Sequence, residues 1–192
     1  RNELLKEMRP DWAQIDAYTS ILLAHGNQLT RQRQGLVDSL NEPICEAQQA
    51  ISGSSEVLSI DYLPGAGEDF AETLSSMRDR DQRRGQTNAG PHRDEVGVLI
   101  NDRPASKFAS EGQQRTIALA LKLGQMELLR KRRDQTPILL VDDVFGELDP
   151  KRRDALMQAL PRESQKLVTT TSRKWLPNEE GIQAAIFDVS EG

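Results

Sequence analysis

The sequence of 192 residues predicts an α/β protein, in which a mostly parallel sheet with flanking helices is joined to an α-helical arm lobe. The carboxyl-terminal half alternates short apolar strands with helices, an order that implies right-handed crossovers between parallel strands. The amino-terminal part repeats apolar residues at spacings of three, four and seven, which is typical of amphipathic helices. We therefore expect the helical arm over residues 1–85 and the α/β portion over residues 86–192.

The expected arm begins with an amphipathic helix over the first forty residues. Pro10 is expected to interrupt this helix and Pro43 to end it, because proline removes a backbone hydrogen bond and crowds the preceding turn. Composition and alternation then predict a short helix over 44–55, a strand over 57–63 and a helix over 69–84. The arm is thus expected to be mainly helical.

The α/β portion is built around one apolar strand. Ile138 to Val141 form an uninterrupted apolar run behind a proline, which is typical of a strand buried on both faces of a parallel sheet. The other expected elements are a strand over 96–100, a helix over 116–132, a helix from Pro150 through 153–160, and strands over 166–171 and 184–189.

Two adjacent carboxylates, Asp142 and Asp143, follow the apolar run. Ligands of open α/β sheets bind at the carboxyl ends of the strands, where this pair could hold Mg²⁺ and orient a water molecule. The pattern is that of a Walker B motif, with Asp142 as the candidate metal ligand and both aspartates as candidate catalytic residues. The alternative is that the two side chains cap a turn after an ordinary core strand.

A second motif, SEGQQR at residues 110–115, opens the expected helix. Ser110 supplies a hydroxyl, Gly112 allows close approach of a backbone or ligand, and Gln113 belongs to the same first turn. Exposed N–H groups at such a helix terminus attract phosphate. For this motif alone, the alternative is a serine N-cap followed by a tolerated glycine.

Three motifs together resemble the ABC-type ATPase superfamily, in the branch that includes SMC proteins. SEGQQR resembles the signature, the aspartate pair the Walker B motif, and Glu147-Leu148-Asp149 the D-loop. GPHRDE at residues 90–95, LLVDDVFGELD and the threonines at 169–171 are also similar to the RecF family of bacterial replication and recombination-repair ATPases. The resemblance covers residues 87–175 closely. Two departures from the wider ABC pattern favour RecF: Asp143 stands where most ABC proteins have glutamate, and threonines stand where a histidine is usual.

The resemblance implies ATP and Mg²⁺ as cofactors and a homodimer that forms on ATP binding. The signature of one subunit would contact the nucleotide held by the other, and Asp143 would act as general base or position the water. The site residues implied are Ser110, Gly112 and Gln113 in the signature, Asp142 and Asp143 as the catalytic pair, Glu147 and Asp149 in the D-loop, and Thr170 and Thr171 at the switch.

The resemblance also implies macromolecular partners. These are double-stranded and single-stranded DNA, junctions at gapped or stalled replication intermediates, and the RecR and RecO proteins that support recombinase loading. Hydrolysis would reset a clamp on DNA, because loss of the γ-phosphate removes charge-assisted contacts that the two subunits share. Spacing and charge by themselves indicate none of these partners.

The sequence contains no GxxxxGK[ST] motif, the loop that cradles nucleotide phosphates. We therefore expect the chain to be the carboxyl-terminal part of a longer protein whose other lobe carries Walker A, and this part alone to be inactive. Two rival classes remain. One is another SMC-like ATPase of repair or defence, and the other is a non-hydrolysing module that only docks a partner.

Composition is that of a cytoplasmic globular protein without a membrane partner. The single cysteine, Cys45, excludes an internal disulfide framework, and no apolar run approaches the ~18 residues that a membrane helix needs. Aromatic residues make up 4%, which argues against a stacking platform for single strands. The net charge of -5 is unusual for a DNA-binding protein, but local basic patches still act within a Debye length of about 8 Å.

Six basic residues are candidates for contacts with DNA or with the edge of the nucleotide site: Arg78, Arg80, Arg83, Arg84, His92 and Arg93. The alternatives are a solvated helix end for the four arginines and, for the GPHRD turn, pairing with nearby carboxylates. Metal binding by His92 is not expected, because the only other histidine is His25, in the arm. The clusters at 130–133 and 151–153 can also be solvated helix ends, which is the preferred interpretation of 130–133.

Overall fold

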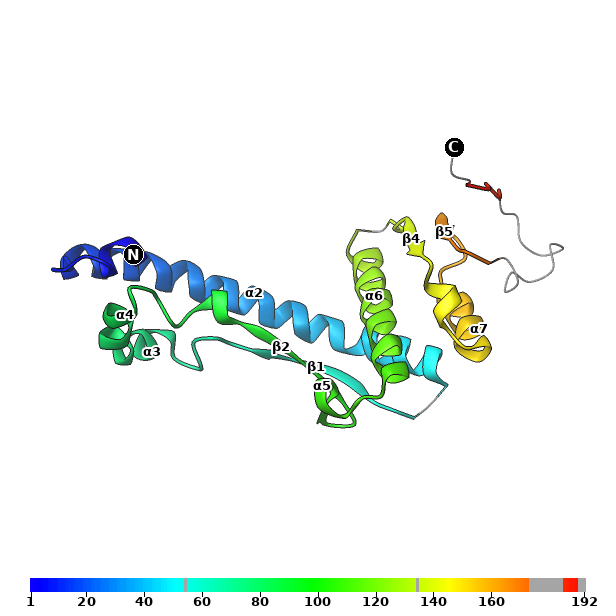
Figure 1. Ribbon diagram of the computed structural model, residues 1–192, viewed down its shortest axis with the longest axis horizontal. Helices are drawn as coiled ribbons and strands as arrows, with labels where there is room; N and C mark the ends of the chain where they lie inside the picture. Colours follow the sequence, from blue (N-terminus) through cyan, green and yellow to red (C-terminus); the bar gives the residue numbers. More distant parts are fainter. Residues whose placement is uncertain (54, 134, 173–184, 190–192) are drawn as a thin grey trace.

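The computed structural model describes residues 1–53, 55–133, 135–172 and 185–189. The molecule is elongated along α2, with α1, α3 and α4 at one end and α6, α7, β4 and β5 at the other (Figure 1). Its elements are α1 Asn2–Leu5, α2 Trp12–Ser52, β1 Leu58–Leu63, α3 Phe70–Ser76, α4 Arg78–Arg84, η1 Pro91–Arg93, β2 Glu95–Ile100, β3 Arg103–Pro104, α5 Ala105–Phe108, α6 Glu111–Arg133, β4 Leu139–Asp142, η2 Val144–Glu147, α7 Pro150–Ala159 and β5 Lys166–Thr169.

Helix α2 is a single rod of 41 residues. The interruption predicted at Pro10 is confirmed, since α2 starts at Trp12 behind the N-cap Asp11, whose carboxylate accepts from the Gln14 amide at 3.2 Å. The end predicted at Pro43 is wrong, because Pro43 lies inside the helix and the left-handed Gly53 ends it. Proline removes one hydrogen bond of the helix, but packing of this stretch on α6 keeps it helical.

The arm sheet has three antiparallel strands in the order β1-β2-β3. Leu58 pairs with Ile100 and Leu63 with Glu95, and the two-residue turn at Asn101 and Asp102 has positive φ at both positions, as a tight hairpin requires. The strands predicted over 57–63 and 96–100 are confirmed. They come from both sides of the boundary predicted at residue 85, so the arm's sheet also uses residues of the following segment.

The helix predicted over residues 69–84 is present as two helices that meet at Met77. Asp69 caps the first of them, accepting from the Glu72 amide at 2.9 Å. Gly85, in the left-handed conformation, ends the second.

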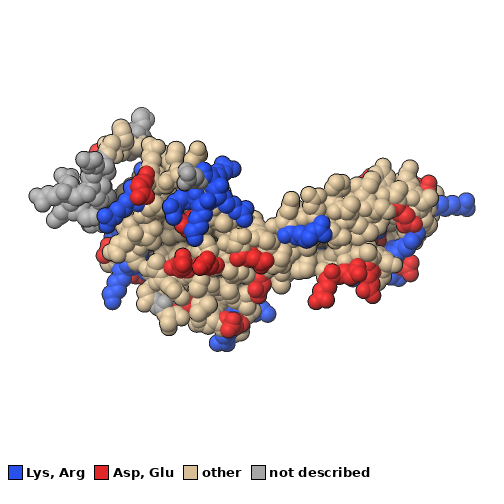
Figure 2. All heavy atoms as spheres, turned by 180° about the vertical axis from the view of Figure 1, so that it is seen from behind, with Lys and Arg blue, Asp and Glu red and all other residues tan. Residues whose placement is uncertain are grey.

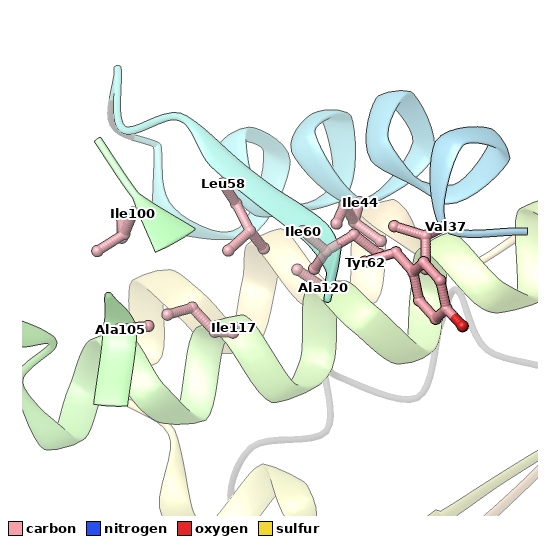
Figure 3. Close-up of a cluster of buried hydrophobic side chains, with 9 residues drawn as sticks. All are labelled: Val37, Ile44, Leu58, Ile60, Tyr62, Ile100, Ala105, Ile117 and Ala120. Atoms are coloured by element: carbon pink, nitrogen blue, oxygen red, sulfur yellow. The ribbon is translucent and has the colours of Figure 1, made fainter. Parts of the chain in front are cut away.

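The main core lies where α2, the arm sheet and α6 meet. Figure 3 shows its side chains converging from these elements and from α5; they are Val37, Ile44, Leu58, Ile60, Tyr62, Ile100, Ala105, Ile117 and Ala120. The helices α2 and α6 cross in close contact at Gly124, where a Cβ would lie 2.4 Å from Ile44 Cγ2. This core therefore joins the arm to the helix that opens with the signature motif.

Strands β4 and β5 form a two-stranded parallel sheet, which confirms the predicted parallel pairing. A second core covers one face of it, with Phe145 and Leu156 buried against Leu123 of α6. The other face is exposed: Leu140 is 76% and Leu167 54% exposed. The prediction of a strand buried on both faces is wrong for this chain, because the described residues provide a covering layer on one face only.

Two further expectations concern the ends of this region. Residues 185–189 are not in a strand, so the strand predicted over 184–189 is wrong there, and residue 184 lies outside the described residues. Strand β5 ends at Thr169, two residues before the predicted limit. Within the described part of the chain, no helix combines the length and the apolar character needed to cross a membrane.

Candidate nucleotide site

The carboxyl ends of β4 and β5 bring three oxygen-bearing side chains together. Asp142 and Thr169 are register partners in the parallel ladder, and the Thr169 hydroxyl donates a hydrogen bond to Asp142 Oδ1. The Asp143 amide donates both to the Thr169 carbonyl at 3.2 Å and to the Thr169 hydroxyl oxygen at 3.1 Å. Both carboxylates are exposed at this edge of the sheet, the place where open α/β sheets bind ligands.

Asp143 occupies the left-handed region, with φ 47 and ψ 17. Aspartate is among the few residues other than glycine that adopt this conformation readily, so the turn from β4 into η2 is compatible with an acid here. Its Oδ1 accepts from the Thr171 amide at 3.4 Å. Thr170 instead closes its own turn, since its hydroxyl donates to the Ser172 carbonyl at 2.9 Å.

Of the two switch residues expected from the sequence, Thr171 contacts Asp143 and Thr170 bonds to Ser172. Thr169, the first of the three threonines that the sequence places at this strand end, makes the closest contacts. The parallel register opposite Asp142 is the signal that identifies Thr169, and the register is not visible in the sequence.

The donors at this edge fit Mg²⁺, a hard cation that prefers oxygen ligands. Within the described part of the chain, no cluster of three or more His, Cys, Asp and Glu side chains forms a complete metal site. Mg²⁺ commonly uses one or two carboxylates and completes its shell with water and substrate phosphates. Asp142 and Asp143 are therefore suited to an ion shared with a bound nucleotide.

The signature motif forms a capping box at the start of α6. Ser110 Oγ accepts from the Gln113 amide at 3.3 Å, and the Gln113 side chain accepts from the Ser110 amide at 2.8 Å. The N-cap alternative for this motif is therefore geometrically correct. It is compatible with phosphate binding, because the box satisfies the amides of residues 110 and 113 and leaves those of Glu111 and Gly112 for a ligand or solvent.

The start of α7 lies against this motif. A Cβ at Gly112 would meet Arg152 Nη1 at 2.7 Å, so the guanidinium occupies the space that glycine leaves. Asp149 caps α7 by accepting from the Arg152 amide at 3.1 Å, and its Oδ2 lies 3.6 Å from Arg152 Nη1. The structure therefore brings the signature and the D-loop together. For Glu147 the structure describes only the backbone, which ends η2.

The signature and the aspartate pair are two separate groups. Among the described residues, no hydrogen bond or ion pair joins Ser110, Gly112 or Gln113 to Asp142 or Asp143. Gln113 reaches in the other direction, donating to Glu56 Oε1 at 2.6 Å in the segment before β1. The signature motif and the aspartate pair are therefore joined by no direct contact within the described chain.

The GPHRD turn is held by its aspartate, which sequence reasoning did not single out. Asp94 accepts from Arg33 Nη1 at 2.6 Å, from the Gly65 amide at 2.9 Å and from the Tyr62 hydroxyl. Burial raises the pKa of the Asp94 carboxyl, but these hydrogen bonds outweigh it and leave that pKa below its usual value. Burial and the same carboxylate raise the pKa of Tyr62.

His92 and Arg93 lie on the outside of this turn. A ring nitrogen of His92, Nε2, lies 3.1 Å from the Thr87 carbonyl, and His92 lines an open hollow of about 660 Å³ together with His25. Arg93 is exposed and makes no ion pair with any described residue. The pairing with carboxylates proposed as the alternative is therefore made by Asp94 and Arg33 rather than by His92 and Arg93.

The four arginines of α4 differ from one another. Arg78 stacks on Trp12 at 4.0 Å from the ring centroid and lies 3.4 Å from Asp16, whereas Arg84 donates to Asn88 at 3.4 Å. Arg80 and Arg83 are exposed and form no ion pair with described residues. Figure 2 shows basic and acidic side chains interspersed at the arm's end, while the largest basic group on that face lies over the wider part of the molecule.

The strand-ending aspartates, the capped signature helix and the D-loop turn before α7 define part of an ABC-type ATPase. No protein-family model matches the chain. The DNA replication and repair protein RecF of Geotalea daltonii is 36% identical over 203 residues, and that of Microcystis aeruginosa 34% over 216 residues; both alignments include 100% of this chain. The chain belongs to the RecF family.

A solved structure of the recombination mediator protein RecF-ATPrS in the RecFOR pathway is similar in fold as well, with a TM-score of 0.77 and 29% identity over 92% of this chain. The chain spans about half the length of the relatives it matches, 55% for the Geotalea protein and 50% for the solved structure.

Proposed function

We propose that the chain supplies the signature, the Walker B-type aspartates and the D-loop of an ATP-driven DNA-repair clamp, within a longer protein that also carries a phosphate-binding loop. Two observations support the longer protein. The curated relatives are nearly twice as long as the chain. The apolar face of β4 and β5, with Leu140 76% exposed, offers a surface on which further parts of a sheet domain can pack.

The single observation that carries the proposal is the separation of the two halves of the site. Ser110 and Gly112 open α6, and among the described residues no hydrogen bond or ion pair joins them to the aspartate pair, so we propose that the two groups act on different nucleotides. A second copy resolves this: the signature of one subunit contacts the γ-phosphate of the nucleotide held beside the aspartates of the other. ATP then bridges the two subunits, and its hydrolysis separates them.

At the aspartates, each side chain has a distinct role. Asp142, oriented by the Thr169 hydroxyl, is the ligand suited to Mg²⁺. Asp143, held in the left-handed turn with its Oδ1 near the Thr171 amide, positions the attacking water or accepts its proton. An aspartate is one methylene shorter than glutamate, so it reaches less far toward the water, which supports slow hydrolysis and a long-lived clamp.

The clamp's partners follow from the relatives. The solved structures belong to a recombination mediator in the RecFOR pathway, and the curated relatives are replication and repair proteins. We accordingly propose gapped DNA and its junctions as the substrate, RecO and RecR as the partner proteins and the cytoplasm as the location. The exposed cations Arg80, Arg83 and Arg93 are the arm's candidates for phosphate contact.

The test is ATP-dependent dimerisation of the full-length protein, meaning this chain together with the further sequence that its relatives have. Light scattering is recorded with ATP and with ADP for the unsubstituted protein and for three variants of Ser110. Ser110→Asp and Ser110→Asn both keep an N-cap, but only the aspartate repels a phosphate. Ser110→Arg removes the cap and adds bulk.

We expect ATP to dimerise the unsubstituted protein and Ser110→Asn, and to fail with Ser110→Asp and Ser110→Arg. Asp143→Asn should remain dimeric after ATP is added, because hydrolysis no longer resets it. A monomer with ATP in every case would favour the non-hydrolysing docking module instead. Normal turnover in Asp143→Asn would exclude the role given to that residue.

A further inference from the structure

The first turn of α7 carries three consecutive cations, Lys151, Arg152 and Arg153. This is the wrong end of a helix for them, because the helix dipole disfavours positive charge at an N-terminus. The interpretation as a solvated helix end, which fits a C-terminus, therefore does not apply here. Lys151 is exposed, and Arg153 donates to the Leu148 carbonyl at 3.2 Å, whereas Arg152 points toward the start of α6.

Arg152 lies directly over the signature glycine. Measured from an ideal Cβ at Gly112, its Nη1 is 2.7 Å away, its Cζ 3.6 Å and its Nη2 3.7 Å, so the whole guanidinium covers this position. The distance of 3.6 Å to Asp149 is long for an ion pair, and both side chains are partly exposed, so the ion pair alone contributes little to holding it. The guanidinium therefore lies beside the Gly112 backbone, in the space that a side chain at this position would fill.

The contact links two motifs that belong to different helices. Asp149 caps α7 through the Arg152 amide, so the D-loop acid and the guanidinium are fixed to the same turn. The guanidinium then rests on the second residue of α6, inside the signature capping box. If the D-loop moves relative to the signature, this contact must break; if the contact holds, the two motifs must move together.

We propose that Arg152 is a positioning residue that locks the D-loop to the signature, and that Gly112 lacks a side chain in order to admit it. This role rests on the proposed ATP-driven dimer, in which both motifs face the partner subunit and must reach it in one fixed arrangement. Arginine suits the role better than lysine, because a planar guanidinium can lie flat over a backbone and an ammonium cannot.

A double-mutant cycle in the full-length protein tests the proposal, using Gly112→Ala and Arg152→Ala. The measured quantity is the dissociation constant of the ATP-bound dimer, with nucleotide affinity of the monomer and unfolding temperature recorded alongside. Each single change should weaken the dimer about tenfold, a typical size for a lost well-placed contact, while monomer affinity for ATP stays unchanged. Lys151→Ala removes one charge from the same turn and is the matched control, expected to dimerise normally.

The double variant, Gly112→Ala with Arg152→Ala, shows whether the two residues act through the same contact. Because alanine at 112 acts by displacing the guanidinium, we expect it to have no further effect once Arg152 is absent. An equal loss from Gly112→Ala in both backgrounds would overturn the proposal and show that the glycine serves the nucleotide alone. Where Gly112→Ala fails to fold, Arg152→Lys takes its place, and normal dimerisation of that variant would also overturn the proposal. An unsubstituted protein that stays monomeric with ATP would overturn the proposed function and this role with it.

Discussion

The arm and the ATPase portion differ in how far the apolar residues of their strands are buried. In the arm, β1 buries Leu58, Ile60 and Tyr62 against α2 and α6. In the ATPase portion, β4 and β5 leave Leu140 and Leu167 more than half exposed. Along β1 these buried residues alternate with the more exposed Ser59, Asp61 and Leu63. On the open face of the ATPase sheet, Leu140 and Leu167 are register partners and form an apolar surface that another layer can cover.

The two regions also differ in the exposure of their aspartate side chains. The side chains of Asp81 and Asp94 in the arm are 0% and 6% exposed and are bonded to several donors, including Arg1 at 2.9 Å and Arg33 at 2.6 Å. Asp142, Asp143 and Asp149 in the ATPase portion are exposed at a strand end or a helix start. Buried, fully bonded carboxylates hold a fold together, while exposed ones at such places remain available for a metal or a partner.

The largest expected effect is on the core that joins the two regions. Ile44→Ala removes a fully buried side chain that packs against Gly124, and it should lower the free energy of unfolding of the chain by about 3 kcal/mol. Urea unfolding followed by circular dichroism measures this. Leu36→Ala, on the exposed side of the same helix, is the control and should cost less than about 0.5 kcal/mol. A small loss for Ile44→Ala would mean that the two regions are joined elsewhere.

A smaller loss is expected from the arm's buried carboxylate. Asp94→Asn removes the charge that Arg33, Tyr62 and the Gly65 amide all donate to, which should cost about 2 kcal/mol. Asp61→Asn, an exposed change on β1, is the matched control in the same urea experiment. Equal stability of the two variants would contradict a structural role for the GPHRD turn.

The same network predicts how stability depends on pH. Because the folded-state pKa of Asp94 is below its usual value, its contribution is present above about pH 4 and is lost as the pH falls further. The raised pKa of Tyr62 gives the opposite sign: its contribution is present below about pH 10 and is lost as the pH rises. Urea midpoints measured across this range should show both losses, and Asp94→Asn should flatten the acid one. An unchanged acid limb in that variant would contradict the assignment.

The smallest effect on the stability of this chain is expected at the open face of the ATPase sheet. Leu140→Ser should change the stability of the chain by no more than about 0.5 kcal/mol, because the side chain is already exposed. It should also reduce self-association, measured by sedimentation. In the full-length protein, the same change should cost about 2 kcal/mol if this face becomes buried. Equal small effects in both proteins would show that nothing packs on it.

Much of the local structure could be predicted from the sequence. The strands at 57–63 and 96–100, the helix after Ser110 and the helix starting at Pro150 all depend on residues close together in the chain. The end predicted at Pro43 failed, because packing on α6 outweighs the local effect of one proline. The burial predicted for β4 failed as well, since an apolar run shows what a strand can bury but not whether a covering layer is present.

The sequence by itself determined the order of the motifs and their places on a helix start, a strand end and a turn, because these follow from short-range spacing. Only the tertiary structure decided which residues meet: Gly112 with Arg152, Thr169 with Asp142, and Asp94 with Arg33 and Tyr62. These contacts join residues that are 27 to 61 positions apart in the chain, from Thr169 with Asp142 to Arg33 with Asp94. Pairings over such distances depend on how the helices and strands pack together, and no local pattern encodes them.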